Sequence, residues 1–198
     1  MKILIRNNKE YNTGVHPHIT EIRFKGHNPG KFFSENRFPS LVILTIKDVV
    51  FDFFDRVPIE LKLKHPSLRK LSYEGHRTEK LELDCPSLQE LCCISSQLME
   101  LNLNCPSLLR LYCSGSQVSK LKLDCPLLDT VVCHSNLLTE LDLNCPSLRK
   151  LRCQGNLLSN LNGLEFCSEL KELYCSAALS ESVEILKAHL PELVVKLF

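Results

Sequence analysis

The chain has 198 residues, with 24 Lys or Arg against 23 Asp or Glu, so its formal net charge is +1. This balance excludes a bulk electrostatic attraction toward nucleic acid or an anionic membrane. With 44% hydrophobic residues, 7% aromatic residues and no Trp, the composition indicates a folded protein with an aliphatic core. The 11 cysteines point to disulfides, metal binding or packing, and other features must decide among these.

No stretch of the chain approaches the roughly 18 to 20 consecutive apolar residues of a membrane span. The apolar start at Ile3, Leu4 and Ile5 meets Arg6 too soon to form the core of a signal peptide. We therefore expect a cytoplasmic protein, located in a host cytosol if it is a delivered effector.

A repeat with a period of 20 residues occupies most of the chain. Its marker is a Cys-Pro-x-Leu tetrapeptide, which loses its Pro in the last copy and is preceded upstream by Phe and His versions. A seven-residue insertion separates the first two copies. The seven recognisable copies begin at Phe38, His65, Cys85, Cys105, Cys125, Cys145 and Cys167.

Each copy contains two short alternating stretches, such as Leu111-x-Cys113 and Leu121-x-Leu123. Alternation of this kind predicts strands. Each strand would expose an apolar face unless the equivalent strand of the next copy stacked on it, which is the organisation of a solenoid. The Cys-Pro step favours extended geometry followed by a turn. We therefore predict coils that run strand, turn, strand, turn.

Residues 148–158 read Leu-x-x-Leu-x-Cys-x-x-Asn-x-Leu and resemble a leucine-rich repeat of the short, irregular, cysteine-containing class. The resemblance covers residues 38–198 and implies an arc of parallel strands with a ligand-binding face. It also implies that Asn136 and Asn156 satisfy backbone groups at the turn. A coil of 20 residues leaves no room for a helix on the back, so the predicted fold is a β-rich solenoid with slight curvature and little helix.

The ends of such a stack must hide its apolar cross-section. We expect residues 1–37 to form an N-terminal cap, residues 38–179 the leucine-rich repeats and residues 180–198 a C-terminal cap. In the C-terminal cap, Ser182 to Leu190 predicts a short amphipathic helix that stops at Pro191. A closing strand should follow, with Leu193, Val195 and Leu197.

Function must lie on outward strand positions, because the inward positions build the scaffold. In the first strand of each coil the expected inward residues are Leu71, Leu91, Leu111, Val131, Leu151 and Leu173. Tyr and Arg are over-represented among interface hot spots, so the outward Tyr112, Arg152 and Tyr174 are the expected anchors for a protein partner. The predicted protein-binding set is Lys70, Ser72, Glu90, Cys92, Arg110, Tyr112, Val132, His134, Lys150, Arg152, Glu172 and Tyr174.

The second strand of each coil carries an outward row of Lys, Glu, Asn and Asp residues that predicts a solvated polar wall. The basic residues Arg69, Lys70, Arg77 and Lys80 lie near one coil, but aromatic residues do not alternate with them. We therefore expect no nucleic-acid binding.

Catalytic motifs are absent from the sequence: it holds no Gly-rich phosphate loop, nucleophile elbow or His-Glu-x-x-His helix. We expect no enzymatic activity, no cofactor and no small-molecule substrate. The alternative is a cysteine-dependent enzyme or redox sensor centred on Cys92, with a thiol pKa lowered by nearby Arg110. His16, His18 and His27 suggest either a metal site or, as we favour, a polar surface loop.

Ten cysteines fall into two ladders, and Cys92 alone is left over and points outward. Neighbours in a ladder should lie about 4.8 Å apart with parallel Cβ vectors, which suits disulfide geometry poorly. A zinc site would not repeat in every coil. We therefore interpret the ladders as packing by a small hydrophobe. The ladder residues are Cys85, Cys105, Cys125, Cys145 and Cys167, and Cys93, Cys113, Cys133, Cys153 and Cys175.

These expectations describe a non-enzymatic interaction module that binds another protein through the exposed face of the repeat strands. A delivered bacterial effector or a regulator, acting by occlusion of its partner's working surface, is the specific form that we expect. A fold alone does not determine function, so the outward residues carry this prediction.

Overall fold

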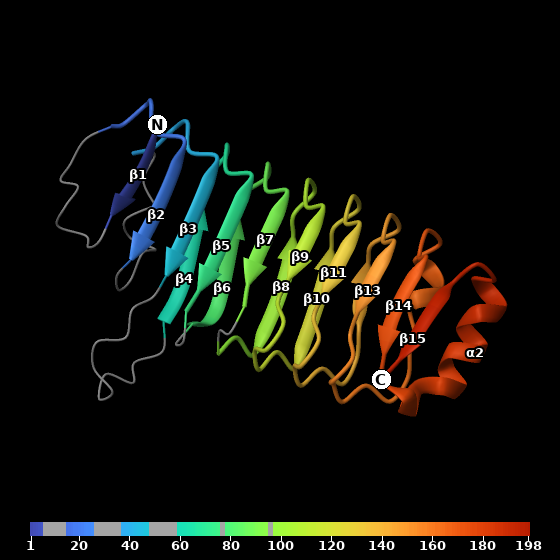
Figure 1. Cartoon of the computed structure of the whole chain (residues 1–198). Coiled ribbons are helices and arrows are strands. Elements are labelled where there is room, and N and C mark those ends of the chain that lie inside the picture. The colour runs from blue at the N-terminus through green and yellow to red at the C-terminus, as the bar shows by residue number, and fades with distance from the viewer. Residues whose placement is uncertain (6–14, 26–36, 48–58, 76–77, 95–96) are drawn as a thin grey trace, which may run out of the picture.

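The computed structural model describes residues 1–5, 15–25, 37–47, 59–75, 78–94 and 97–198. It is a β-solenoid of about seven turns built from stacked parallel strands. The strands follow one another in a nearly straight row from the N-terminal end to the C-terminal end, where one helix lies (Figure 1). The predicted fold class is therefore confirmed.

The front sheet is the larger of the two faces and contains ten strands among the described residues, all parallel to their neighbours. Its first two strands come from the segment predicted as an N-terminal cap, which extends the same sheet. In spatial order the strands are β1 (Lys2–Ile5), β2 (Glu21–Lys25), β3 (Ile43–Lys47), β5 (Lys70–Glu74), β7 (Glu90–Cys93), β9 (Arg110–Tyr112), β11 (Thr130–Val132), β13 (Lys150–Arg152), β14 (Glu172–Cys175) and β15 (Val194–Leu197).

The back sheet is formed by the second strand of each coil, and among the described residues it consists of two separate pieces. The first piece pairs β4 (Ile59–Lys64) with β6 (Thr78–Asp84). The second piece contains β8 (Glu100–Asn104), β10 (Lys120–Asp124) and β12 (Asp142–Asn144). β6 and β8 still lie side by side, as predicted for equivalent strands of successive copies, but no hydrogen-bonded ladder joins them.

The last coil has no back strand among its described residues, which corrects the predicted alternation of strand and turn. A short 3-10 helix, η1 (Leu164–Phe166), stands there instead. Gly163 precedes it with φ of 92°, a left-handed conformation that favours glycine, and its amide donates to the Glu165 carboxylate over 2.7 Å. The chain therefore turns where an extended strand was expected.

The core lies between the two sheets and is built from the predicted inward positions. All six of these side chains in the front sheet, Leu71, Leu91, Leu111, Val131, Leu151 and Leu173, are at most 1% exposed. Alternation in the sequence therefore assigned the inward face correctly along the whole row.

The cysteines pack as predicted. All eleven are free thiols, ten of them buried and Cys92 half-buried. Burial raises the pKa of Cys105 and of Cys145 to about 12 and that of Cys85 to about 11. These thiols remain neutral at physiological pH and serve as small apolar side chains.

The Asn residues at the turn satisfy backbone groups, as the resemblance implied. The Asn136 side-chain amide donates to the carbonyl oxygens of Cys113 (2.8 Å) and Cys133 (3.0 Å), and its oxygen accepts from the Val118 amide (3.2 Å). Asn156 repeats the pattern one coil later. Each Asn thus links two successive coils at the same corner.

At the C-terminal end, η2 (Ala177–Leu179) leads into α2 (Ser180–His189), which begins two residues before the predicted helix and ends ahead of Pro191. Val183 and Leu186 are buried against the core, and β15 follows as the predicted closing strand. No helix in the described part of the chain is long and apolar enough to cross a membrane.

Candidate functional site

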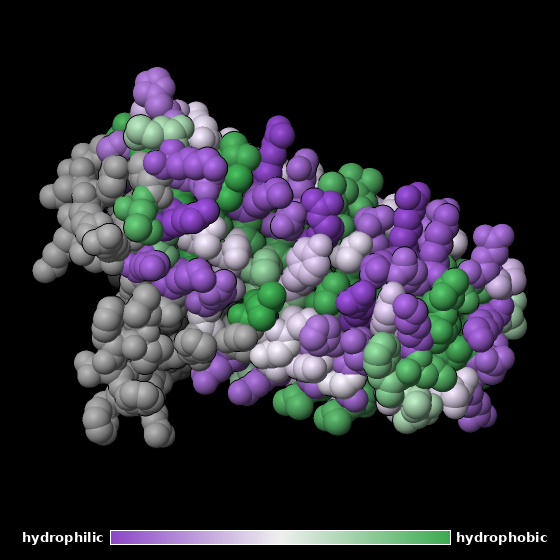
Figure 2. Space-filling model, in the orientation of Figure 1, coloured by the Kyte–Doolittle hydropathy of each residue, from purple (hydrophilic) through white to green (hydrophobic). Residues whose placement is uncertain are grey.

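The outer face of the front sheet carries the predicted binding residues in straight columns, because successive coils are in register. Tyr112, Val132, Arg152 and Tyr174 stand beside one another in β9, β11, β13 and β14, and all four are half-buried. Polar side chains cover most of this face, and apolar side chains gather near its C-terminal end (Figure 2).

One flank of this face is held together by ion pairs between neighbouring strands. Glu90 lies 3.3 Å from the Lys70 ammonium and 3.1 Å from the Arg110 guanidinium. Partial burial raises the pKa of Glu90, and hydrogen bonds from Arg110 and Lys70 outweigh this and bring the pKa below its usual value. Lys70, Glu90 and Arg110 thus already hold partners within the sheet.

A second group of charges surrounds Tyr174, and we call Lys150, Arg152, Glu172, Tyr174 and Lys196 the Tyr174 cluster. The Arg152 guanidinium carbon lies 4.4 Å from the centre of the Tyr174 ring, and the ammonium nitrogens of Lys196 and Lys150 lie at 5.3 and 5.4 Å. Cations within about 6 Å of a ring centre are attracted by its negative face. Three cations therefore share one aromatic ring.

Glu172 is the one carboxylate of the cluster and is bound from two sides. The Lys150 ammonium lies 2.6 Å from its Oε2, and the Tyr174 hydroxyl donates to the same oxygen over 3.1 Å. These two hydrogen bonds, led by that from Lys150, hold the pKa of Glu172 below its usual value. Glu172 thus fixes the Tyr174 ring and compensates one of the three cations.

Two cations of the cluster, Arg152 and Lys196, form no ion pair among the described residues. Arg152 is half-buried, and its buried Nε has no hydrogen-bond partner, whereas Lys196 is exposed. A cleft of about 320 Å³ adjoins the cluster and is lined by Glu172, Tyr174, Val194 and Lys196. The arrangement can accept an anionic group, such as a carboxylate, against a planar guanidinium.

The predicted anchors do not form one compact site. Arg152 and Tyr174 lie together, whereas Tyr112 lies three strands away, at about 14 Å for ordinary strand spacing. His134 is half-buried and interacts with the Ser135 hydroxyl over 3.2 Å. Lys196 and the Phe198 ring, which stacks on Tyr174 at 6.2 Å, were missing from the prediction. The sequence did hold a signal for Lys196, because one more 22-residue step along the repeat from Tyr174 leads to it.

The Cys92 thiol is not activated, so the expectation of a lowered pKa is wrong. Its pKa is raised, mainly by burial and also by the carboxylates of Glu74 and Glu90, against a hydrogen bond with Ser72. Arg110, the expected activator, pairs with Glu90 instead. The alternative of a reactive cysteine therefore loses the electrostatic basis on which it rested.

Metal-ligand geometry is absent from the described part of the chain, where no group of three or more His, Cys, Asp or Glu residues could hold an ion. The His16 ring stacks on Phe38 with centres 5.4 Å apart, and His27 lies outside the described residues.

The fold and this face define the protein as a β-solenoid with a charged, aromatic outer surface. No family model matches the chain, and no curated protein matches it. Its function must therefore be inferred from its own geometry.

Proposed function

We propose that the chain is a non-enzymatic leucine-rich-repeat module that binds an acidic segment of another protein through the C-terminal part of its front sheet. The observation that carries this proposal is the Arg152 guanidinium, which stacks on Tyr174 without an ion pair while the flanking cations Lys70 and Arg110 already contact Glu90. Arg152 therefore keeps its charge for a partner carboxylate, and the exposed Lys196 on the same ring adds a second cation without an ion pair among the described residues.

The leucine-rich-repeat assignment is supported by the repeated Leu positions in the core and by the side-chain bonds of Asn136 and Asn156 at the turn. A partner bound to this face contacts several strands of the front sheet at once. Occlusion of the partner's working surface, as by an effector or regulator, is the mode of action that we propose.

The proposal is tested by pull-down and mass spectrometry with the wild-type chain and with Arg152→Ala and Tyr174→Ala variants. Truncation of a hot-spot residue weakens binding by about 30-fold, so both variants should fail to retain the partner. Tyr174→Phe keeps the ring beneath Arg152 and should retain most of the binding.

Arg110→Ala is the matched control, because Arg110 lies on the same face but is paired with Glu90. It should bind almost as well as wild type. If Arg152→Ala captures the same partner as strongly as the control does, the assignment of this face is incorrect.

A further inference from the structure

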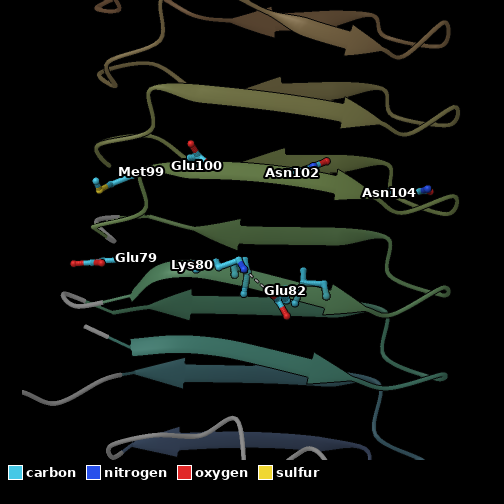
Figure 3. Close-up of a pocket in the computed structure, with 9 residues that line it drawn as sticks. Glu79, Lys80, Glu82, Met99, Glu100, Asn102 and Asn104 are labelled. Carbon is cyan, nitrogen blue, oxygen red and sulfur yellow. Dashed lines mark ion pairs between the residues drawn. The ribbon is translucent and has the colours of Figure 1, made fainter. Parts of the chain in front are cut away.

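An open strand edge can accept another strand only where there is room beside it. β6 and β8 form no ladder with each other, but they lie side by side, with Lys80 and Glu82 on β6 and Asn102 on β8 (Figure 3), so no strand fits between them. β15 is different, because it is the last strand of the front sheet in the described part of the chain (Figure 1). It pairs with β14 on one side only, and its outer edge faces the end of the stack.

The backbone groups of β15 divide between its two sides. The Val194 amide donates to the Lys171 carbonyl over 2.9 Å, and the Phe198 amide also bonds to β14, over 3.1 Å. Backbone groups alternate between the two sides of a strand, so the amides and carbonyls of Val195 and Leu197 face away from β14. Among the described residues these groups have no hydrogen-bond partner. They can pair with an incoming strand.

The apolar interior of the stack is not closed at this edge. Val195 and Leu197 occupy the inward positions that Leu173 and Cys175 occupy in β14. Leu173 and Cys175 are fully buried, whereas Val195 is half-buried and Leu197 is 46% exposed. The inward side of β15 therefore has apolar surface that a further strand of the front sheet would cover.

The C-terminal helix closes the back of the last coil and leaves this front edge open. α2 contacts η1, which stands where the back strand of the preceding coil was expected, and it buries Val183 and Leu186. The exposure of Leu197 shows that α2 does not cover the inward side of the edge. A strand added in the plane of the front sheet would lie beside β15, in front of the helix layer.

The outward side chains of β15 define what the added strand would meet on its other side. Val194 is 58% exposed, and Lys196 is exposed and forms no ion pair among the described residues. The Glu172 carboxylate on β14 is already bound by Lys150 and Tyr174. An Asp or Glu of the added strand beside Lys196 would form a favourable cross-strand pair.

The charge around β15 favours a single acidic residue in the added strand. Glu192 is exposed and precedes β15, four residues from Lys196, which is about 13 Å in an extended chain. A second carboxylate at that end of the strand would face Glu192. The other positions face Val194, Val195 and Leu197, which favour apolar side chains.

We propose that the outer edge of β15 binds an extended, mainly apolar segment of a partner protein, which adds as a further strand to the front sheet and places one Asp or Glu beside Lys196. The edge supplies backbone hydrogen bonds, and alternate apolar side chains cover Val195 and Leu197. The inference rests on the proposed function in that the segment belongs to the partner whose carboxylate contacts Arg152.

The test uses the full chain and a phage-displayed library of linear decapeptides. Enriched peptides should contain a run of apolar residues with one Asp or Glu and without Pro, and a synthetic fluorescein-labelled copy should bind in fluorescence anisotropy. Leu197→Pro removes an outward amide but no bond to β14, so it should weaken peptide binding by about tenfold or more.

Leu197→Val is the matched control, because Val and Pro have the same number of side-chain carbons but Val keeps the amide. Its binding should stay within about twofold of wild type. Circular dichroism checks that both variants are folded. If Leu197→Pro does not fold, Lys196→Glu provides the second test and should weaken binding by about fivefold or more, because it repels the acidic residue of the peptide.

Arg152→Ala separates this edge from the proposed function. Arg152 lies two strands from β15, so the variant should bind the peptide within about twofold of wild type while it loses the partner in the pull-down. If Arg152→Ala retains the partner and the peptide still needs the Leu197 amide, the proposed function fails and the edge site stands. If Arg152→Ala loses the partner but neither Leu197→Pro nor Lys196→Glu weakens peptide binding, the edge site alone fails.

Two further results would overturn the proposal. One is a library that enriches no peptide, or only basic ones. The other is a dimer of the chain in sedimentation velocity that Leu197→Pro dissociates, because a second copy would then occupy the edge of β15.

Discussion

The coil at residues 65–84 has the same length as the three coils after it, residues 85–144, yet only those three form a continuous back sheet. The difference lies in the two ladder positions. His65 and Tyr73 stand in coil 65–84 where each of the next coils has two cysteines. A ladder of identical small side chains keeps both sheets in register, and a larger side chain in one coil preserves the front sheet and breaks the back one.

The front sheet survives because its strands begin at a corner that the large side chain does not reach. Leu71 and Leu91 pair directly across β5 and β7, and the amides of Gln89 and Glu90 both donate to the Arg69 carbonyl. Tyr73 lies at the other end of the strand, next to the turn into β6. The comparison therefore teaches that local volume at one corner decides the pairing of the strand that follows it.

The largest expected contrast is in amide hydrogen exchange. The Asn102 amide points toward β6, with which β8 forms no ladder, whereas the Lys122 amide, one coil later, points toward β8 in an intact ladder. Lys122 should exchange about a thousandfold more slowly than Asn102, because its exchange requires opening of the packed sheet. Exchange followed by NMR measures both amides in one experiment. Equal protection would mean that β6 and β8 pair in solution.

Tyr73→Cys restores the ladder residue but should destabilise the protein by about 2 to 4 kcal/mol. Gly75 and Thr78 are shaped around the ring, so the smaller side chain leaves a cavity and an unpaired buried hydroxyl. Urea denaturation measures the change in the free energy of unfolding. Tyr73→Phe should cost about 1 kcal/mol, for the lost hydroxyl alone. A gain in stability with Tyr73→Cys would show that the ring strains the coil instead of filling it.

His65, which stands where the later coils have a cysteine, makes the stability of the fold depend on pH. Burial lowers the pKa of His65 below its ordinary 6.5, against the effect of its hydrogen bond with the Phe38 carbonyl (3.0 Å), and its Nδ1 has no partner. As the pH falls below about 6.5, the unfolded chain takes up the proton first, so the folded state loses stability. Above that pH, His65 is neutral in both the folded and the unfolded state, and this loss of stability is absent.

This dependence is measured as the change in Tm between about pH 7.5 and about pH 5.5. His65→Cys restores the ladder residue and should lose less stability over that interval than wild type. An identical loss in both proteins would contradict the assignment to His65.

The smallest expected effect sharpens the comparison within the regular coils. Gly115, Ser135 and Gly155 occupy the same corner with φ of 68°, 56° and 66°, whereas Gly75 in coil 65–84 does not adopt a positive φ. Only Ser135 carries a side chain in this left-handed conformation. Ser135→Gly should therefore raise the free energy of unfolding by about 0.5 to 1 kcal/mol in denaturant titrations.

Ser159→Gly is the control for this gain. Ser159 is exposed, and its φ is not positive, so glycine there should lower the stability slightly through the entropy of the unfolded chain. A gain from both substitutions would mean that the effect at Ser135 is not conformational.

Much of the fold could be predicted because it depends on patterns with a fixed period. The inward row from Leu71 to Leu173, the two cysteine ladders and the C-terminal helix follow from local alternation and from the 20-residue repeat. The column that holds Arg152 and Tyr174 was predicted for the same reason. Lys196 was missed because residues 180–198 were predicted as a cap, so the outward column was not continued into the closing strand.

The state of each charged group could not be predicted in this way. Whether Arg110 acts on Cys92 or on Glu90 depends on side-chain distances between strands, and the structure places it 3.1 Å from the Glu90 carboxylate. Likewise the replacement of the last back strand by η1 depends on the left-handed Gly163, which the repeat pattern does not reveal.

The sequence by itself determined that this protein is a stack of short parallel strands, because each apolar face can be buried only by its own copy in the next coil. Tertiary structure alone decided where the stack is incomplete. One buried Tyr73 in a column of smaller side chains changes the space at a corner, and no pattern along the chain shows how the next strand will respond. Such a change is transmitted by close packing, and β6 forms a ladder with β4 but none with β8.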